Sequence, residues 1–325
     1  MPETAPSAAC RPRPDAAVFD ELAQLAARRQ VSPDTFELRL RAPRIAEAAR
    51  PGQFANVLVP SAGFGTRAFD DADAWLARER GPSPTLIRRP FSIYRSDGDS
   101  FDLLVKAVGR GSRQLAALEA GAELFVLGPL GNTFDLPPEG ATAALVAGGC
   151  GWASLAMLAR ELRRRGHPTY AFIGAATVDD LPLDTREGPR PPHPFLDDLP
   201  RVCVTSQELE ALGITVALAA EAGGQLYGGL VTDLLARFLR RDNAERVHVY
   251  ACGPWAMLRC VAQLADEFGG PCQVSLEERM GCGLGVCNSC VVEVVLPDGT
   301  PGHRKLCTDG PVLNASEVNW EQERR

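Results

Sequence analysis

The chain has 325 residues, which is long enough for two or three domains. Hydrophobic residues make up 45% and charged residues 23%, an ordinary globular composition, and no apolar run approaches the roughly 18 residues that a membrane span needs. The net charge of −7, with no basic stripe, argues against nucleic acid as the main partner, so we expect neither nucleic acid nor a membrane to be bound.

Residues 1–15 contain no apolar core, so they do not form a secretory signal and are expected to be a disordered tail. Without such a signal we expect a cytoplasmic protein, in which thiols stay reduced. Six of the ten cysteines are scattered singly and are typical of small buried residues. The other four gather near the C-terminus, and composition alone does not explain them.

Residues 16–137 have the pattern of a small antiparallel β-barrel. Short β-rich segments separated by turn signals occur at 36–42, 54–60, 86–96 and 100–108. A helix that ends at a glycine is predicted over 112–121, and a last strand follows it. Residues 61–85 interrupt this rhythm and are predicted to be a surface insertion, partly helical around 70–80.

Two features of this barrel are suited to bind a flavin dinucleotide. Arg89, in the sequence RRPFS, can pair with a pyrophosphate, and Ser92 can hydrogen-bond a flavin ring. Gly111 and Ser112 open a helix close to Lys106 and offer backbone donors to a phosphate. The alternatives are a strand with a surface arginine and a plain helix N-cap, and both stay open at this point.

Residues 138–271 alternate strands with helices, which predicts βαβ units and a parallel, Rossmann-like sheet. In the sequence ALVAGGCGW a strand is followed by a glycine-rich turn and a helix. Gly148, Gly149 and Gly151 would let a dinucleotide approach the helix N-terminus. The alternative is an ordinary tight turn between strand and helix. The proline-rich stretch at 185–200 is predicted to be a loop.

A later strand ends in the sequence YACGP. Cys252, Gly253 and Pro254 therefore lie at the carboxyl edge of the predicted sheet, where open α/β sheets bind their ligands. We expect Cys252 beside a nicotinamide, and the alternative is a buried thiol at the strand end. No arginine follows the strand that ends in AFIG, at residues 175–179, so the sequence favours NADH over NADPH.

The last segment, 272–325, contains the four clustered cysteines and one predicted hairpin. The cysteines follow the spacing C-x4-C-x2-C, and sixteen residues separate the third from the fourth: Cys282, Cys287, Cys290 and Cys307. This spacing is typical of a plant-type [2Fe–2S] cluster, and the glycines between the thiols let backbone amides approach the cluster sulfurs. The alternatives are a structural zinc site, which favours paired C-x2-C knuckles, and thiols without a ligand.

The order of barrel, nucleotide domain and cluster resembles that of a known family. The chain is similar to the electron-transfer subunits of NAD-dependent, heteromeric dihydroorotate dehydrogenases, within the ferredoxin–NADP reductase superfamily. The similarity runs from about residue 36 to residue 311 and is carried by RRPFSI, VGRGSRQL, LGPLGNTF, VAGGCG, GGLVTDLL, YACGPWAML, EERMGCGLGVCNSCVVEV and KLCTDGPVL.

This resemblance implies a multidomain α+β and α/β fold: an antiparallel FAD-binding β-barrel (16–137), a Rossmann-like nicotinamide-binding sheet (138–271) and a small C-terminal [2Fe–2S] subdomain (272–325). It implies an FAD site formed by Arg89, Pro90, Phe91, Ser92, Leu104, Val105, Lys106, Gly111 and Ser112. The four cysteines would ligate the cluster. Ser92 at the flavin and Cys252 at the nicotinamide would be the residues in contact with the reacting rings.

The resemblance also implies a partner, an FMN-containing catalytic subunit that oxidises dihydroorotate in pyrimidine biosynthesis, assembled with this chain as a heterotetramer. The chain would relay electrons between that FMN and NAD through the cluster and FAD. A reductase with the same cofactors that serves another partner, such as a ferredoxin- or sulfide-linked system, is the alternative. A zinc-stabilised nucleotide-binding module without a redox role is a further one.

Overall fold

The computed structural model describes residues 17–59, 88–190, 197, 202–224, 226–241 and 246–322. The tail expected at 1–15 and the insertion expected at 61–85 lie outside these residues. Among the described helices, none has the length and apolar character required to cross a bilayer.

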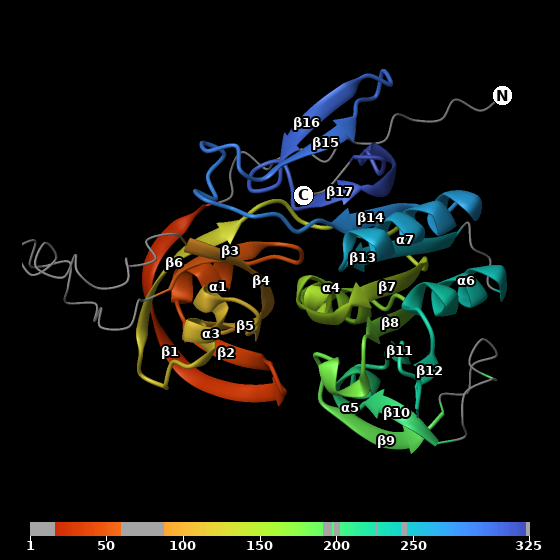
Figure 1. Cartoon of the computed structure of the whole chain (residues 1–325), viewed down its shortest axis with the longest axis horizontal. Helices are drawn as coiled ribbons and strands as arrows, with labels where there is room; N and C mark the ends of the chain where they lie inside the picture. The colour runs from red at the N-terminus through yellow and green to blue at the C-terminus, as the bar shows by residue number, and fades with distance from the viewer. Residues whose placement is uncertain are drawn as a thin grey trace, which may run out of the picture.

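Six antiparallel strands close into a barrel in the order β1-β2-β5-β4-β3-β6, coloured red to yellow in Figure 1. Their bounds are β1 Phe19–Ser32, β2 Thr35–Arg41, β3 Phe54–Leu58, β4 Arg88–Asp97, β5 Ser100–Lys106 and β6 Glu123–Leu130. Two short helices, α1 (Pro43–Ala48) and α3 (Arg110–Ala116), pack on β5. The predicted antiparallel barrel is confirmed.

The helix predicted over 112–121 was placed wrongly. It begins at Arg110 and ends at Ala116, well before the glycine that was expected to end it. The cause is the position of Ser112, which is not an N-cap. Its hydroxyl lies in the first turn and accepts a hydrogen bond of 3.0 Å from the N–H of Gly109, and this bond fixes the start of the helix.

The two faces of strand β3 pack against different parts of the molecule. Ala55 and Val57 point into the barrel core, where they pack with Leu38, Leu103 and other fully buried side chains. Because successive side chains of a strand alternate, Phe54 and Asn56 point out of the barrel. Phe54 belongs to a second apolar cluster, which contains two of the C-terminal cysteines. The outer face of β3 therefore forms part of the contact with the C-terminal segment.

Beside the barrel lies a seven-stranded sheet in the order β12-β11-β8-β7-β13-β14-β17 (Figure 1). Its strands are β7 Thr142–Gly148, β8 Thr169–Ala175, β11 Thr215–Ala220, β12 Tyr227–Gly228, β13 Val247–Cys252, β14 Cys272–Ser275 and β17 Val312–Asn314. All neighbouring strands run parallel except β14 and β17. The predicted parallel sheet is confirmed, and its parallel strands present both faces to helices.

Helices cover the two faces of this sheet. Leu145 on β7 packs with the residues of α4 (Trp152–Arg164), and Val146, the next residue, packs with α6 (Val231–Arg241) and α7 (Trp255–Glu267). Helix α4 lies between the sheet and the barrel, in contact with β4 (Figure 1). Helix α4 therefore joins the sheet to the barrel strand that contains the sequence RRPFS.

Part of the stretch predicted as a loop at 185–200 is a strand, so that prediction was wrong over its first residues. Strand β9 (Thr185–Pro189) pairs with β10 (Val202–Ser206) in an antiparallel ribbon, and α5 (Gln207–Ala211) follows. Backbone pairing with a distant partner overrides the weak strand propensity of glycine and proline at such a ribbon.

The C-terminal segment runs back over the barrel. After β14 the chain forms a loop with the clustered cysteines, then the predicted hairpin of β15 (Val291–Val295) and β16 (Pro301–Lys305) (Figure 1, dark blue). Asn132, which follows β6 of the barrel, clamps the returning chain at Val312. Its side-chain amide donates to the Val312 carbonyl at 2.8 Å, and its oxygen accepts from the Val312 N–H at 3.0 Å.

Candidate dinucleotide cavities and cysteine cluster

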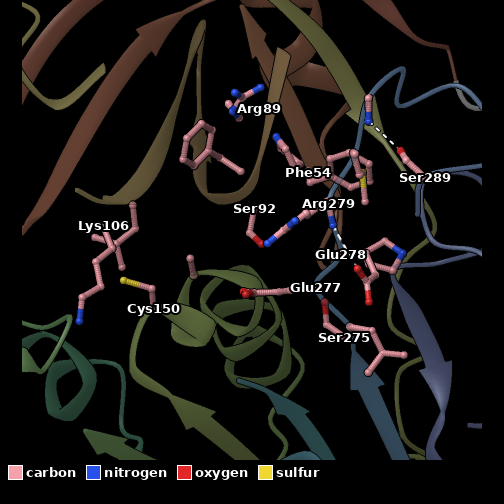
Figure 2. Close-up of a pocket in the computed structure, with 18 residues that line it drawn as sticks. Phe54, Arg89, Ser92, Lys106, Cys150, Ser275, Glu277, Glu278, Arg279 and Ser289 are labelled. Atoms are coloured by element: carbon pink, nitrogen blue, oxygen red, sulfur yellow. Dashed lines mark hydrogen bonds between the residues drawn. The ribbon is translucent and has the colours of Figure 1, made fainter. Parts of the chain in front are cut away.

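A cavity of about 810 Å³ lies between the barrel, the glycine turn before α4 and the C-terminal segment (Figure 2). Barrel strands β4 and β5 form one wall with most of the residues expected to hold a flavin: Arg89, Pro90, Phe91, Ser92, Leu104 and Lys106. Arg279 comes from the opposite wall and reaches across the cavity towards Ser92 (Figure 2). The cavity thus combines apolar barrel side chains with three cations, Arg89, Lys106 and Arg279, and with two carboxyl groups, Glu277 and Glu278. The two guanidinium groups can pair with an anionic ligand, and the apolar side chains can pack on a planar ring.

Three other residues expected at this site are placed differently. The backbone of Gly111 runs beside Arg89, since a Cβ on Gly111 would stand 3.5 Å from Arg89 Nε. Val105 is fully buried in the barrel core and does not line the cavity. Ser112 uses its hydroxyl within the first turn of α3. The structure therefore brings Gly111 to the arginine, while Val105 and Ser112 support the strand and helix that carry the site.

A second cavity, of about 640 Å³, opens at the carboxyl edge of the parallel sheet. It contains the glycines of the turn before α4 and the Gly253–Pro254 corner after β13: Gly148, Gly149, Gly151, Gly253 and Pro254. The turn and the corner touch each other, because a Cβ on Gly148 would stand 2.4 Å from Pro254 Cδ. Only glycine leaves the backbone of this turn free to approach a ligand so closely.

The thiol of Cys252 lies in neither cavity. The residue is fully buried, and its sulfur lies 4.0 Å from Glu277 Oε1. Burial raises the pKa of the Cys252 thiol well above its ordinary value, so the group is protonated at neutral pH. A contact between this thiol and a nicotinamide stays a prediction, whereas Gly253 and Pro254 line the cavity directly.

Three side chains line both cavities and form the boundary between them: Lys106, Cys150 and Glu277. They come from the barrel, from the glycine turn and from the segment after β14. Burial lowers the pKa of Lys106, but Asp34 and Asp180, 3.5 and 3.6 Å from its ammonium, outweigh burial and raise it. Burial raises the pKa of the Cys150 thiol to about 11. The junction therefore holds a neutral thiol beside a cation.

Sequence reasoning missed Cys150, Glu277 and Arg279 as residues of these cavities. Glu277 extends into the cavity (Figure 2), and the surrounding chain raises the pKa of its carboxyl group by desolvation, although water still reaches the side chain. The only sequence signal for Cys150 is its place inside GGCG. For Glu277 and Arg279 the signal is their place between strand β14 and the first clustered cysteine.

The four clustered cysteines approach one another as two pairs. The sulfurs of Cys290 and Cys307, both buried, lie 3.3 Å apart. Cys282 and Cys287 each donate a backbone N–H to the other's sulfur, at 3.4 Å in both directions. Within the described part of the chain, no three His, Cys, Asp or Glu side chains surround a single point as ligands of one ion. Two pairs of thiols fit a cluster with two irons better than one tetrahedral zinc.

Backbone amides of the loop point at these sulfurs. Leu284 and Val286 donate N–H groups to Cys282 Sγ at 3.4 and 3.3 Å, and Gly285 donates to Cys307 Sγ at 3.1 Å. The loop reaches this shape through left-handed backbone at Gly283 and Gly285, with φ of +72° and +78°. Amide donors around thiolates are the environment that an iron–sulfur cluster requires, so the loop fits such a group.

The first cavity and the cysteine loop share a wall. Met280, Gly281 and Ser289 line the cavity. Gly281 directly precedes Cys282, Ser289 directly precedes Cys290, and Met280 lies two residues before Cys282. The Gly281 N–H donates to Ser289 Oγ at 2.9 Å (Figure 2), and the same hydroxyl lies 3.1 Å from Cys287 Sγ. A ligand in this cavity would therefore be separated from the cysteines by one layer of chain.

Known proteins resemble this chain both in sequence and in fold. Residues 277–319 match the iron–sulfur cluster binding domain of dihydroorotate dehydrogenase B. The chain is 31% identical over 306 residues to the electron transfer subunit of dihydroorotate dehydrogenase B (NAD(+)) from Desulforamulus reducens, covering 94% of this chain and 99% of that protein. The corresponding subunit from Bacillus caldolyticus is 33% identical over 300 residues, with coverages of 90% and 96%.

Solved structures share the fold at lower identity. An NADH-dependent reduced ferredoxin–NADP oxidoreductase superposes with a TM-score of 0.69 at 24% identity, covering 93% of this chain and 91% of that one. Phthalate dioxygenase reductase superposes with a TM-score of 0.53 at 16% identity, covering 89% and 94%. At these identities the likeness shows the arrangement of barrel and sheet and carries no conclusion about the partner.

Proposed function

The chain belongs to the family of electron-transfer subunits of NAD-dependent dihydroorotate dehydrogenase B, and from this premise we propose that it carries electrons between a dihydroorotate-oxidising catalytic subunit and NAD. Its cofactors are FAD, a [2Fe–2S] cluster and NAD. The single observation that carries the proposal is the shared wall: the barrel cavity borders the sheet-edge cavity through Cys150 and Glu277, and it borders the cysteine loop through Gly281 and Ser289.

When bound, FAD exchanges a hydride with NAD and single electrons with the cluster, so the protein has to supply orientation and electrostatics rather than an acid or a base. We assign FAD to the larger cavity. Arg89, with the backbone at Gly111 beside it, would hold the pyrophosphate, and Ser92 would orient the ring on the barrel wall. Arg279 offers a second cation from the opposite wall.

We assign NAD to the cavity at the edge of the sheet, where Gly148, Gly149 and Gly151 would let its phosphates approach the start of α4. Besides Glu277, two further acidic side chains, Asp180 and Glu221, line this cavity. Their charge disfavours an additional phosphate group, which supports NAD rather than NADP as the ligand. At the junction, Lys106 and Cys150 line both cavities and would lie beside both ligands.

The cluster would be held by Cys282 and Cys287 as one pair and by Cys290 and Cys307 as the other. The loop around them presents two exposed apolar side chains, Leu284 with 52% and Val286 with 78% of their surface accessible. We infer that this loop faces the catalytic subunit, because exposed apolar side chains beside a redox centre suit a protein–protein contact.

The finer assignments follow from the same premise. We propose that the catalytic partner contains FMN, that two copies of each subunit form a heterotetramer, and that the complex serves pyrimidine biosynthesis in the cytoplasm, where a reducing environment keeps cysteine ligands available. We also propose the division into a flavin barrel (16–137), a nicotinamide domain (138–271) and a cluster subdomain (272–325). Strands β14 and β17 of the last segment join it to the nicotinamide sheet.

The test uses anaerobically purified full-length chain and the dihydroorotate-oxidising protein from the same organism. FAD, iron and acid-labile sulfide are measured on the chain, followed by NADH oxidation with a soluble dye and by NAD reduction with dihydroorotate in the mixture. The proposal expects one FAD and one two-iron cluster per chain, dye reduction by the chain alone, and dihydroorotate-dependent NADH formation by the mixture only. A colourless zinc protein, or a mixture that does not couple dihydroorotate to NAD, would contradict it.

A further inference from the structure

The barrel touches the cysteine loop through a buried polar side chain. Asn56, on the outer face of β3, is 0% exposed. Its side-chain amide lies against the backbone of Gly283, because a Cβ on Gly283 would stand only 2.0 Å from Asn56 Nδ2. Leu130 Cδ1, on the neighbouring strand β6, lies 3.3 Å from the same Cβ position. Asn56 is therefore pressed against the residue that directly follows Cys282.

Neither polar atom of this side chain has a hydrogen-bond partner among the described residues. A buried amide without a partner costs on the order of 1–3 kcal/mol, so such a group in a well-packed contact indicates a missing acceptor or donor. Asn132 provides a contrast at the same boundary. Its amide donates to the carbonyls of Asp309 and Val312, and its oxygen accepts from the Val312 N–H. One asparagine clamps the loops, whereas the other has unused polar atoms.

The surroundings of Asn56 define the acceptor that fits. The amides of Leu284 and Gly285, on the two residues after Gly283, already donate to Cys282 Sγ and Cys307 Sγ. The loop therefore directs N–H groups at sulfur from its own side. The amide of Asn56 approaches the same loop from the barrel side, where sulfur is the acceptor that the neighbouring donors use.

We propose that Asn56 is a positioning residue for the cluster, and that its Nδ2 would donate an N–H···S hydrogen bond from the flavin barrel to a sulfur of the bound cluster rather than to a cysteine sulfur. This inference rests on the proposed function, because it requires the cluster. A donor to a cluster sulfur stabilises the reduced cluster, which carries more negative charge, and so raises its reduction potential. The side chain that separates barrel and cluster would thereby also set how electrons divide between the flavin and the cluster.

The experiment compares full-length wild-type chain with two variants. Asn56→Leu keeps the branched outline and removes both polar atoms, and Asn56→Asp keeps the shape and replaces the donor by an anion. All are reconstituted anaerobically with FAD and cluster. The midpoint potentials of cluster and flavin are measured by titration followed by EPR and absorbance. Iron content and thermal midpoint establish that each variant is folded and loaded.

We expect Asn56→Leu to lower the equilibrium constant for cluster reduction on the order of tenfold, the effect of one hydrogen bond to a charged group, which is about 59 mV for a one-electron couple. Asn56→Asp should lower it further, because an anion replaces the donor. The flavin potential should not change. Gln53→Leu is the matched control: Gln53 is also a buried barrel amide, but its bonds go to Gly131 and Arg50, so its loss should lower the thermal midpoint alone.

The outcomes separate the two proposals. If the wild-type chain contains no iron or sulfide, it holds no cluster, and the proposed function is wrong. Wild-type chain that holds the cluster, together with unchanged cluster potentials in both Asn56 variants, overturns the role of Asn56 and leaves the proposed function standing. If Asn56→Leu does not fold, the potential of Asn56→Asp decides in the same way.

Discussion

Gly151 touches the backbone of Cys252: a Cβ on Gly151 would stand 2.2 Å from the carbonyl oxygen of Cys252. Gly151 has an ordinary helical φ of −56°, so space rather than backbone conformation requires glycine here. The contact joins the turn after β7 to the end of β13, which are adjacent strands of the sheet. Gly151 also lines the cavity to which we assign NAD.

The substitution Gly151→Ala should therefore move the turn away from β13 and weaken NADH binding. We expect at least a tenfold rise in the KM for NADH in dye reduction and a loss of about 1–3 kcal/mol of unfolding free energy, the usual cost of overpacking. Gly188→Ala is the control, because its added methyl group meets only the tip of Thr205 at 3.3 Å, away from both cavities. An unchanged KM in Gly151→Ala would show that NADH binds elsewhere.

Arg89 is expected to anchor FAD. It lines the larger cavity, and Gly111 lies beside its Nε. Arg89→Leu should weaken FAD binding by roughly 10–100-fold, because a hydrogen-bonded charge pair contributes about 1.5–3 kcal/mol. FAD retained after gel filtration is the measurement. Arg89→Lys keeps the charge but not the planar fork and should retain an intermediate amount. Full FAD occupancy in Arg89→Leu would show that Arg89 does not bind the flavin.

Asp102 should make the stability of the barrel depend on pH. Its carboxyl group is 2% exposed, and burial, with Glu37 nearby, raises its pKa from 3.8 to about 6 in spite of Arg39. A raised folded-state pKa means that the unfolded chain ionises first, so this group lowers the unfolding free energy as pH rises from about 4 to about 6, by up to roughly 3 kcal/mol, with no further change above that range.

Urea titrations of wild-type chain and Asp102→Asn at several pH values check this. The unfolding free energy of the variant should rise relative to the wild type between pH 4 and 6 and then run parallel to it. Asp97→Asn is the control, since Asp97 also faces Arg39, at 3.6 Å, but is 84% exposed. The prediction is wrong if the difference in unfolding free energy between wild type and Asp102→Asn is the same at pH 4 and pH 7.

The barrel and the sheet were predictable because their strands alternate apolar and polar residues or form short apolar runs. Strand β1 was not, since FDELAQLAARRQVS is rich in alanine and charge and buries few side chains. It becomes a strand only by pairing with β2 and β6, and β6 is about a hundred residues away. Strands β14 and β17 are too short to leave a pattern, and partners distant in sequence create them.

The site, too, could be predicted where its residues are close in sequence and not where they come from distant segments. The cysteine spacing is local, so it could be recognised without a structure. The junction of the two cavities is not local, because Lys106, Cys150 and Glu277 come from three parts of the chain. The orientation of Cys252 is also not local: the sequence ACGP places it at the carboxyl edge of the sheet, and the alternation of β13 turns its thiol into the core with Leu145 and Tyr250.

Val286, at the tip of the cysteine loop, is expected to contact the catalytic subunit. Val286→Asp should weaken the complex at least tenfold, since a charge would replace a valine whose burial contributes about 1.5 kcal/mol or more. FAD and iron contents should not change. Val178→Asp, at an exposed valine of the nicotinamide domain, is the control. Binding is measured by titrating the catalytic subunit, and equal affinities of the two variants would place the interface elsewhere.

Removal of the cluster should stop electron transfer between the catalytic subunit and FAD but leave NADH oxidation by FAD intact. Cys290 is buried with its sulfur 3.3 Å from that of Cys307, so Cys290→Ala removes a ligand from inside the loop. We expect the loss of iron and sulfide but not of FAD, because the flavin cavity is lined by the neighbouring Ser289 and not by the cysteine itself.

NADH oxidation by a soluble dye, which takes electrons from the flavin, should therefore stay within about twofold of wild type, whereas dihydroorotate-dependent NADH formation by the complex should fall to background. Cys203→Ala, at a buried cysteine outside the loop, is the control and should keep both activities. If Cys290→Ala keeps its iron, the four cysteines are not the ligand set. If it loses the cluster and still couples dihydroorotate to NAD, electrons do not pass through this loop.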